Sequence, residues 1–373
     1  MRDRRKDHFF VFVARVLALP RLLVRAAAFL FDGRSPVLSR AKSRLLIWID
    51  LVWWGLKFGE INEFYFLYGF EHLSWSEQDK YLSYRALRRH RDWGNGSCRS
   101  EGVGLDYKCL IRDKFVFGQF AASLGFSVPV VLGIVADKRV VVFSGGLQPI
   151  RFHDFLEVVP LLGTDIWLKS VLGACARSVW HVQCEGGRRS VNGVPTAYFE
   201  HMNASVRYVI QVGVRQHPAL AALHPHSVNT LRIVTIRSGD DLEIFSVLLR
   251  VGVNGAHSDN WATGGLVGRI DIDSRKTEGL FFSKPPGARA FEVHPDTNVV
   301  LAGIEIPYLF EAIEMVKSFH GFLYGLKSVG WDVAITGEGP VVIEANDDWE
   351  IALHQAVDGG LKTRFFELHG GLP

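Results

Sequence analysis

Three oxygen-bearing side chains near the end of the chain are spaced so that together they could hold a metal ion. Asp332 lies in one apolar stretch, and Glu344 and Asn346 lie in the next, after the turn-forming residues 337–340. This pattern predicts a β-hairpin in which Glu344 and Asn346 share a face and lie close to Asp332. Mg²⁺ takes oxygen ligands and is usually held by one or two carboxylates together with substrate phosphates, so the hairpin predicts a site for a metal and a nucleotide. The alternative is a surface hairpin with ordinary polar ends.

A lysine near the end of a predicted strand could bind the phosphates of such a nucleotide. Lys169 lies in the apolar stretch 165–170, and the small residues 173–176 follow it. The ammonium group would contact a phosphate, and the backbone N–H groups of the small-residue loop would close over it. The stretch lacks the spacing of a P-loop, and the alternative is a solvated lysine on an edge strand.

Three arginines lie inside strand patterns, where a charged side chain needs a partner. They are Arg232, Arg250 and Arg269. The planar guanidinium group of each could pair with a carboxylate of the protein or face an anionic ligand. The sequence favours a structural pairing for at least one of them.

The composition indicates a folded protein of two or three units. The chain has 373 residues, of which 48% are hydrophobic, and this suffices for a substantial core. The formal net charge of +3 is small for this length, so the sequence predicts no nucleic-acid partner. The 4 cysteines show no CxxC spacing, which favours free thiols in a reducing compartment, and we therefore expect a cytoplasmic protein.

The first 32 residues combine basic and apolar side chains. Residues 9–31 are strongly apolar, but arginines and Pro20 interrupt them, so the sequence predicts neither a membrane-spanning helix nor a cleaved signal peptide. We expect a pair of basic amphipathic helices, which either make peripheral contact with the inner face of the membrane through residues 1–32 or pack on the rest of the protein. A second apolar segment, 45–58, carries Asp50 and is too short to span, so it predicts a buried or interfacial helix.

The chain divides into a helical part and a mixed part. A cluster of Gly, Asn and Ser at 91–97 predicts the end of a helix and a domain boundary, which separates a basic, aromatic-rich helical region, 1–95, from residues 96–373. After this cluster helical and strand patterns alternate, which indicates a part of the chain that mixes helices and strands. We expect helices at 74–87, 113–125 and 307–329, strands at 128–135, 140–143, 165–170 and 208–212, and hairpins that include 243–253 and 266–273.

Taken together, these residues resemble the ATP-grasp superfamily, and specifically the sugar-transfer-associated ATP-grasp family. The resemblance extends from about residue 105 to the C-terminus, and the order of the motifs is more specific than any one of them. The matching residues are Asp113-Lys114, Lys169, Ser227 to Arg232, Asp259-Asn260 with Gly264-Gly265, His294-Pro295, and Gly330 to Trp349.

The resemblance implies an ATP-grasp fold, in which two α+β subdomains clasp ATP, preceded here by the helical N-terminal region. The first subdomain would comprise about residues 105–212 and the second 213–373, both within 96–373. The implied cofactors are ATP and Mg²⁺.

The resemblance also assigns roles to single residues around the phosphates. Lys114 and Lys169 resemble the lysines that contact the phosphates of the nucleotide. Asp332, Glu344 and Asn346 resemble the Mg²⁺ ligands between those phosphates. A metal that bridges phosphates neutralises charge during phosphoryl transfer, which agrees with this assignment.

Arginines aimed at the transferred phosphoryl group would stabilise the charge that develops there. Arg232 is the first candidate for this catalytic role, and Arg250 and Arg269 are further candidates. Many relatives that form peptide-like bonds have an arginine two positions before the first metal-binding acid, where this chain has Gly330. An arginine from another strand must therefore take its place, or the reaction differs.

The strand 208–212 resembles the segment that hydrogen-bonds adenine through its backbone. Gln211 stands where an acidic residue is common, with Val212 beside it, and Asn260 is a further nucleotide-binding candidate. Many relatives place an acid shortly after this strand to bind the ribose hydroxyls, whereas residues 215–218 contain none. The preferred nucleotide therefore stays open.

The resemblance implies an ATP-dependent ligase that activates a carboxylate as an acyl phosphate, which an amine or similar nucleophile then captures. The family name links the reaction to polysaccharide or glycoconjugate biosynthesis, with a small molecule or glycan precursor as substrate and a glycosyltransferase as partner. The first alternative is a kinase that phosphorylates a sugar or a lipid-linked sugar. The second is a non-catalytic nucleotide-binding partner of a glycosyltransferase.

Overall fold

The computed structural model describes most of the chain, and three of the predicted features lie partly or wholly outside the described residues. The described ranges are 19–31, 42–96, 106–137, 139–143, 150–151, 165–172, 179–185, 188–191, 194–195 and 206–370. The basic start of the chain, the end of the Gly, Asn and Ser cluster and the small-residue run 173–176 are therefore not described further.

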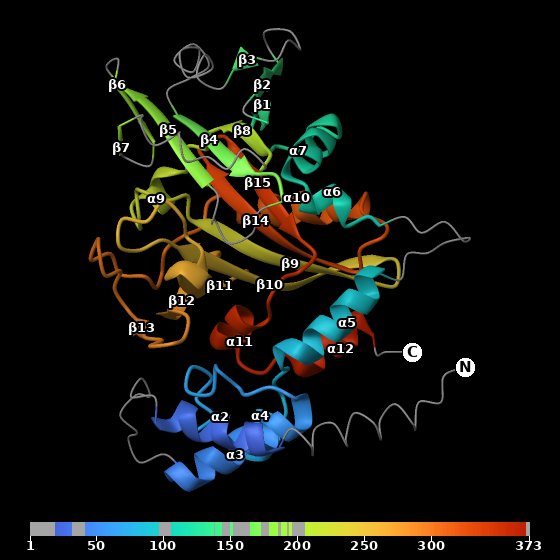
Figure 1. The fold of residues 1–373 in the computed structure, drawn as a ribbon, viewed down its shortest axis with the longest axis vertical. Coiled ribbons are helices and arrows are strands. Elements are labelled where there is room, and N and C mark those ends of the chain that lie inside the picture. The colour runs from blue at the N-terminus through green and yellow to red at the C-terminus, as the bar shows by residue number, and fades with distance from the viewer. Residues whose placement is uncertain are drawn as a thin grey trace.

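The N-terminal region is helical, as the sequence predicts. Its helices are α2 (Leu19–Phe31), α3 (Arg44–Phe58), α4 (Trp75–Gln78) and α5 (Tyr84–Gly96), and α2, α3 and α4 lie together at one end of the molecule (Figure 1). α2 and α3 contact each other through buried apolar side chains that include Ala26, Leu30 and Ile47. Among the described residues, no helix has both the length and the apolar character that crossing a membrane requires.

Two predictions for this region are wrong in detail. Ser74 and Glu77 form a capping box at the start of the helix predicted over 74–87, but α4 ends at Gln78 and a separate helix, α5, begins at Tyr84. The cluster at 91–97 does not break the helix before Gly96. Gly94 serves close packing instead, because a Cβ atom there would lie 2.8 Å from the His369 ring.

The buried carboxylate of Asp50 joins several segments of the N-terminal region through hydrogen bonds. It accepts hydrogen bonds from Lys42 Nζ at 2.7 Å, Tyr65 Oη at 2.7 Å, Trp75 Nε1 at 2.6 Å and Gln78 Nε2 at 3.0 Å. Burial favours the neutral acid, but these donors outweigh it and lower the pKa of Asp50. A charge that the sequence places in the middle of an apolar helix is therefore the point at which three segments are joined.

The next part of the chain forms two short helices and an antiparallel sheet. α6 (Cys109–Arg112) and α7 (Lys114–Ser123) precede eight strands in the spatial order β3-β2-β1-β8-β4-β5-β6-β7. Asp113 begins α7 as predicted, because its side chain accepts hydrogen bonds from the N–H groups of Phe115 and Val116. The strands are β1 (Val131–Ala136), β2 (Arg139–Val142), β3 (Ile150–Arg151), β4 (Asp165–Ser170), β5 (Val179–Glu185), β6 (Arg188–Val191), β7 (Val194–Pro195) and β8 (Tyr208–Val212).

The C-terminal part forms a second antiparallel sheet of seven strands in the order β13-β12-β11-β10-β9-β14-β15. The strands are β9 (Thr230–Ser238), β10 (Asp241–Val251), β11 (Leu266–Asp271), β12 (Lys276–Phe282), β13 (Ala290–Phe291), β14 (Ser328–Thr336) and β15 (Gly339–Asn346). The helices are α9 (Pro218–Ala221), the 3₁₀ turn η3 (Trp261–Thr263), α10 (Leu309–Gly321), α11 (Ala352–Asp358) and α12 (Lys362–His369). The hairpin predicted around residues 337–340 is present as β14 and β15.

The helix predicted at 307–329 is too long. α10 ends at Gly321, and the backbone N–H groups of Phe322 and Leu323 close turns onto Phe319 and His320. Ser328 and Val329 already belong to β14. Apolar residues continue through both elements, so the change from helix to strand leaves no mark in the hydrophobic pattern.

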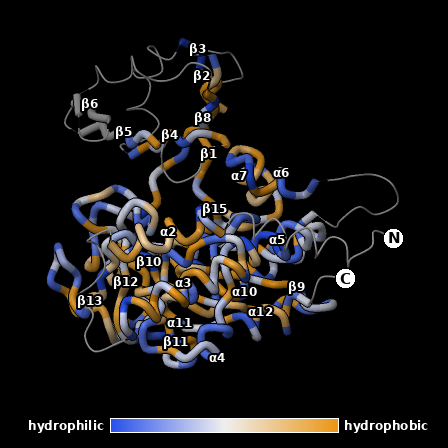
Figure 2. Tube along the Cα trace, turned by 60° about the horizontal axis from the view of Figure 1, so that its bottom comes forward, coloured by the Kyte–Doolittle hydropathy of each residue, from blue (hydrophilic) through white to orange (hydrophobic). Residues whose placement is uncertain are grey.

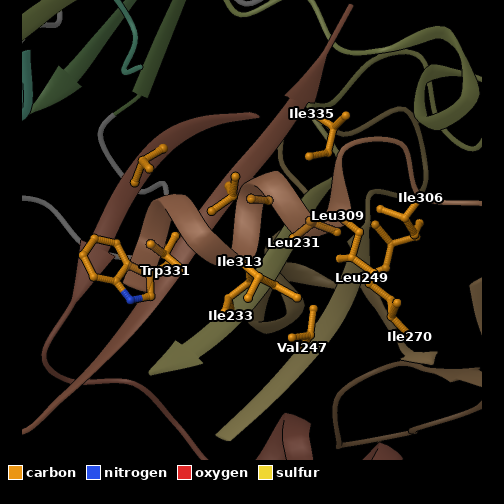
Figure 3. Packing of buried hydrophobic residues seen from close by; sticks show 14 of the residues in the cluster. Leu231, Ile233, Val247, Leu249, Ile270, Ile306, Leu309, Ile313, Trp331 and Ile335 are labelled. Atoms are coloured by element: carbon orange, nitrogen blue, oxygen red, sulfur yellow. The ribbon is translucent and has the colours of Figure 1, made fainter. Parts of the chain in front are cut away.

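One face of the second sheet packs against α10 and forms the largest core. Alternate residues of β9 and β14 point to this face, and Figure 3 shows Leu231, Ile233, Trp331 and Ile335 gathered around Ile313 of α10. The hydrophobic segments in Figure 2 run through the same packed centre. The remaining residues of these strands point to the opposite face, which carries the charged side chains described below.

A buried hydrogen-bond chain fixes the end of α10 to this sheet. Trp331 Nε1 donates to Thr235 Oγ1 at 2.8 Å, and the Thr235 hydroxyl lies 2.7 Å from His320 Nδ1. His320 Nε2 lies 2.9 Å from the Leu326 carbonyl, which can only accept, so Nε2 carries the proton and Nδ1 is the acceptor. Burial lowers the pKa of His320 to about 4.

We expect His320 to make the stability of the fold depend on pH. Between pH 6.5 and 4 the unfolded chain binds a proton at this side chain that the folded chain does not, so lowering the pH favours unfolding. From pH 7 to pH 5 the free energy of unfolding should fall by about 2 kcal/mol through this group alone. Urea unfolding at both pH values should show a loss smaller by this amount in His320→Gln than in wild type, whereas exposed His72→Gln should retain the full loss. Equal losses in wild type and His320→Gln would contradict the assignment.

Candidate functional site

The register of four neighbouring strands brings the central acidic and basic residues onto one face of the second sheet. Asp332 of β14 lies opposite Glu344 of β15 on one side and opposite Arg232 of β9 on the other. Arg232 in turn lies opposite Leu248 of β10, two residues before Arg250. Residues directly opposite each other in an antiparallel sheet share a face, so these charged side chains point to the same side, away from α10.

Asp332 is buried between two arginines. Arg232 Nε lies 2.7 Å from Asp332 Oδ1, and an Nη atom of Arg250 donates to Asp332 Oδ2 at 2.9 Å. The contact with Arg232 lacks hydrogen-bond geometry, so Oδ1 keeps unused acceptor capacity. Burial raises the pKa of Asp332 although both arginines oppose this shift.

Arg250 is held by a second acid that the sequence reasoning did not single out. The guanidinium group of Arg250 donates to Thr230 Oγ1 at 2.8 Å and to Asp259 Oδ1 at 3.2 Å. Asp259 also accepts from the Thr230 hydroxyl at 2.6 Å and from the Thr230 N–H at 2.9 Å. Burial disfavours the charge, but Asp259 and Asp332 outweigh it and raise the pKa of Arg250. The only sequence signal for Asp259 was its place beside Asn260 in the family pattern.

The space beside Gly330 is filled by Arg232 and Trp349. A Cβ atom at Gly330 would lie 2.7 Å from the Cβ atom of Trp349 and 3.5 Å from an Nη atom of Arg232. A larger side chain at 330 would therefore displace its neighbours. The first of the two alternatives that the sequence left open, an arginine from another strand, thus has a structural candidate in Arg232.

Two lysines of the first part of the chain lie near the acidic pair formed by Asp332 and Glu344. Lys114, the first residue of α7, places its Nζ atom 3.3 Å from Glu344 Oε2. Burial lowers the pKa of Lys169, which lies on β4, to about 8, and the charges of Glu344, Lys114 and Asp332 also act on it. Burial alone would raise the pKa of Glu344, but the positive charges of Lys114, Arg250 and Lys169 hold it below its usual range. The structure therefore brings together six of the predicted site residues: Lys114, Lys169, Arg232, Arg250, Asp332 and Glu344.

Asn346 completes an oxygen-bearing set suited to Mg²⁺. Its Nδ2 atom donates to Glu344 Oε1 at 3.4 Å, so the two side chains are neighbours, as their spacing predicts. Two carboxylates and an amide oxygen match a cation that also uses water and phosphate oxygens. Within the described ranges no group of three or more His, Cys, Asp or Glu side chains converges on one point. The set therefore fits a metal that is shared with a substrate, with Glu344 and Asn346 as ligands and Asp332 through its free Oδ1 capacity.

The predicted adenine segment lies at the centre of the first sheet. Gln211 of β8 is buried, opposite Trp167 of β4 and Val131 of β1. The N–H group of Val212 already donates to the Val130 carbonyl at 3.0 Å. A ligand therefore cannot bind this N–H group without breaking a hydrogen bond of the sheet. Only the other groups of Val212 remain available for the predicted contact with adenine.

Two other predicted site residues have structural partners away from the acidic pair. Asn260 caps η3, because its Oδ1 atom accepts from the N–H group of Ala262 at 2.9 Å. Arg269 of β11 is half exposed and forms ion pairs with Glu278 at 3.8 Å and Asp358 at 3.7 Å. Arg269 is thus an arginine whose ion pairs lie away from the acidic pair, whereas Arg232 and Arg250 pair with Asp332.

The residues that follow Asn346 are anchored by two further arginines, which the sequence reasoning missed. Arg112 of α6 forms a bidentate ion pair with Asp347, with both distances at 2.7 Å. The buried Arg91 of α5 pairs with Asp348 and donates to the Trp349 carbonyl. Arg112 and Arg91 are more than 230 residues away in sequence, so no local pattern identifies these partners.

Comparison with known proteins supports an ATP-grasp fold. The sequence model described as sugar-transfer associated ATP-grasp matches residues 106–368. Among solved structures, N5-carboxyaminoimidazole ribonucleotide synthetase from Thermus thermophilus is 12% identical with a TM-score of 0.38, over 71% of this chain and 53% of that one. D-alanine–D-alanine ligase from Helicobacter pylori is 12% identical with a TM-score of 0.39, over 71% and 59% of the two chains.

An ADP complex of an N5-carboxyaminoimidazole ribonucleotide synthetase is likewise 12% identical, with a TM-score of 0.43 over 79% and 59% of the two chains. The chain thus spans little more than half the length of these solved proteins. No curated protein matches it.

We expect Asp332 to be essential for stability as well as for any reaction at this site. Asp332→Ala leaves two buried guanidinium groups without their shared partner, and breaking such a pair typically costs about 3–5 kcal/mol. Arg269→Ala removes a half-exposed arginine and should cost at most about 1 kcal/mol. Urea unfolding followed by circular dichroism measures both variants. Similar small losses in the two variants would show that Asp332 is not part of a buried charge array.

Proposed function

Because this chain belongs to the sugar-transfer-associated ATP-grasp family, we propose that it is an ATP- and Mg²⁺-dependent ligase. The enzyme would activate a carboxylate as an acyl phosphate, and an amine or similar nucleophile would capture it. The observation that carries the proposal is the meeting of Lys114 and Lys169 with Glu344 and Asp332, flanked by Arg232. Cationic side chains around a carboxylate pair suit the phosphates of a nucleotide and a metal between them.

The proposed chemistry needs positioning and charge stabilisation rather than a covalent enzyme intermediate. Glu344 and Asn346, with Asp332, would hold Mg²⁺, which when bound would neutralise negative charge on the transferred phosphoryl group. Lys114 and Lys169 would donate hydrogen bonds from their ammonium groups to the phosphates of ATP. The pKa of Lys169, about 8, leaves this side chain mostly protonated at pH 7.

The reaction would proceed in two displacements. An oxygen of the substrate carboxylate attacks the γ-phosphorus, the bond to the β-phosphate oxygen breaks, and ADP leaves. The nucleophile then attacks the carbonyl carbon of the acyl phosphate, inorganic phosphate leaves, and the proton of the nucleophile passes to solvent. Arg232 would stabilise the charge that develops during the first displacement, and Arg250 would keep Asp332 ionised and in place.

The position of Arg232 supports a ligase over a kinase. Gly330 removes the side chain that many peptide-bond-forming relatives use, and the Arg232 guanidinium group occupies the neighbouring space. The charge that such an arginine supplies is therefore retained, although it comes from β9 instead of β14. We propose a role in polysaccharide or glycoconjugate biosynthesis, with a glycosyltransferase as the partner that uses the product, from the family description.

We expect the ligase activity to depend on ATP, Mg²⁺ and Glu344. Purified protein incubated with ATP, Mg²⁺ and pools of carboxylic acids and amines should release ADP and form a dehydrated adduct that mass spectrometry detects. Glu344→Gln removes the charge that Lys114 and the metal require, and the rate should fall by at least about 100-fold. Arg269→Gln, a half-exposed arginine outside the acidic pair, is the matched control and should retain activity. An unchanged rate in Glu344→Gln would exclude the proposed metal site, and a stable phosphorylated sugar formed without an amine would identify a kinase instead.

We also propose that the N-terminal helices contact an anionic membrane surface in the cytoplasm. α2 exposes Val24 and Phe31, at 68% and 70%, and α3 exposes Leu45 and Trp53, at 66% and 55%. The Arg44 guanidinium group lies 5.8 Å from the centre of the Phe31 ring, so positive charge adjoins these apolar side chains. Apolar and aromatic side chains beside arginines are typical of interfacial helices.

We expect this contact to depend on the exposed apolar side chains. Wild-type protein should float with vesicles that contain anionic lipid, and the Phe31→Gln/Trp53→Gln double variant should remain in the soluble fraction, because both side chains are exposed and their loss spares the core. Tyr324→Gln, which changes an exposed aromatic residue next to α10, is the control and should float like wild type. Equal flotation of all three proteins would exclude this surface.

A further inference from the structure

A cavity of about 280 Å³ lies between the N-terminal helices and the segment that follows the metal-binding hairpin. One wall comes from residues 54–84 together with Arg25, and the other from Glu350 to Ala352, at the start of α11. Figure 1 shows α2, α3 and α4 as a layer next to α11. The first wall lies outside the part of the chain that matches the family, residues 106–368, and the second begins four residues after Asn346.

A buried amide in this cavity has an unused hydrogen-bond donor. Asn62 is only 4% exposed, and its Oδ1 atom accepts from the N–H group of Phe64 at 3.1 Å. Its Nδ2 atom has no hydrogen-bond partner. A buried donor without a partner is unfavourable, so the cavity favours a ligand that supplies an acceptor such as a hydroxyl oxygen.

The charged residues of the cavity favour a neutral or positively charged ligand. Among the described residues that line it, Glu60, Glu63 and Glu350 contribute three carboxylates, and Arg25 contributes one guanidinium group. Glu60 already accepts from the N–H group of Arg85, and Glu350 pairs with Lys284 at 3.0 Å, whereas Glu63 is exposed at the rim. Such a lining repels carboxylates and phosphates and attracts hydroxyl and ammonium donors.

Aromatic side chains complete the cavity and connect it to the charged site. Phe64 and Tyr68 line the cavity and stack on each other with ring centres 5.5 Å apart, so they give it an apolar, aromatic wall. On its other side Phe64 stacks on Trp261 at 6.0 Å. Trp261 follows Asp259, the partner of Arg250, by two residues, so this aromatic stack links the cavity lining to the segment that holds Arg250.

We propose that this cavity binds the nucleophile of the ligation, and that this nucleophile is a neutral or cationic hydroxylated compound of the amino-sugar type. The inference rests on the proposed ligase function and adds to it the chemical class of one substrate. The carboxylate that is activated would bind elsewhere, because the net negative charge of the lining excludes it. The N-terminal helices thereby supply substrate recognition, and the family-matching part supplies the ATP chemistry.

Binding can be measured without ATP, which separates this inference from the proposed function. The probes are glucosamine, N-acetylglucosamine and gluconate, which present similar hydroxyl groups with a positive, neutral and negative charge. In titrations of the full chain followed by saturation-transfer NMR, the first two should bind and gluconate should not. Turnover of ATP without binding of glucosamine or N-acetylglucosamine would overturn this inference and leave the ligase proposal standing.

Two cavity variants and one control test the location. Glu63→Gln should weaken glucosamine binding about two- to fivefold and leave N-acetylglucosamine unaffected, because it removes one rim charge. Asn62→Leu should weaken both ligands about tenfold by removing the free donor. Glu314→Gln, which changes an exposed acid on α10, should change neither. Because Glu63 is exposed, its variant should fold even if Asn62→Leu does not. Two results would overturn the proposal. The first is binding of glucosamine and N-acetylglucosamine that is unchanged both in Glu63→Gln and in folded Asn62→Leu. The second is binding of gluconate that equals the binding of these two probes.

Discussion

The structure depends on keeping the carboxylate of Asp332 charged inside a sheet. A buried charge is tolerated only when it is paired and hydrogen-bonded, and Asp332 meets this requirement through Arg232 and Arg250 on the two next strands. Both arginines then need further acids, and Asp259 supplies one for Arg250. The register of β10, β9, β14 and β15 is therefore set by charge on one face and by the α10 core on the other. A slip of one residue would move the charges into the core and the apolar side chains out of it.

The same requirement couples the two sheets. Lys114 contacts Glu344 with its side chain, and its backbone N–H group donates to the Val171 carbonyl, just after β4. The N–H group of Val342 in β15 donates to the Ser127 carbonyl, just before β1. These bonds place the start of α7, the end of β4 and the hairpin next to one another. The two halves of the ATP-grasp fold thus meet at the cluster in which the proposed phosphate and metal contacts are found.

Local sequence patterns predicted the parts of this site that lie on regular elements. Asp332 and Glu344 alternate with apolar residues on two strands around a tight turn, and Asp113 is a standard helix cap. The hairpin and the start of the helix could therefore both be predicted from residue spacing. Asp259, Arg112 and Arg91 could not, because their roles come from partners distant in sequence. The end of α10 was missed because an apolar helix leads directly into an apolar strand. The cluster of Gly, Asn and Ser at 91–97 was wrongly predicted to end the helix for a different reason: Gly94 is there for close packing and Asn95 for its hydrogen bonds.

Asn95 shows that the N-terminal region is part of the site's framework. Its Oδ1 atom accepts from the N–H groups of Lys327 and Ser328 at 2.9 Å, and its Nδ2 atom donates to the Ser328 and Asp347 carbonyls. One buried side chain of α5 therefore holds the start of β14 against the end of β15, the two strands that carry Asp332 and Glu344. The boundary predicted at 95/96 separates in sequence what these hydrogen bonds join in space. A chain cut to the family-matching residues would leave these carbonyls and N–H groups without partners. The geometry of the proposed ATP site therefore depends on the N-terminal helices, which also line the cavity proposed to bind the nucleophile.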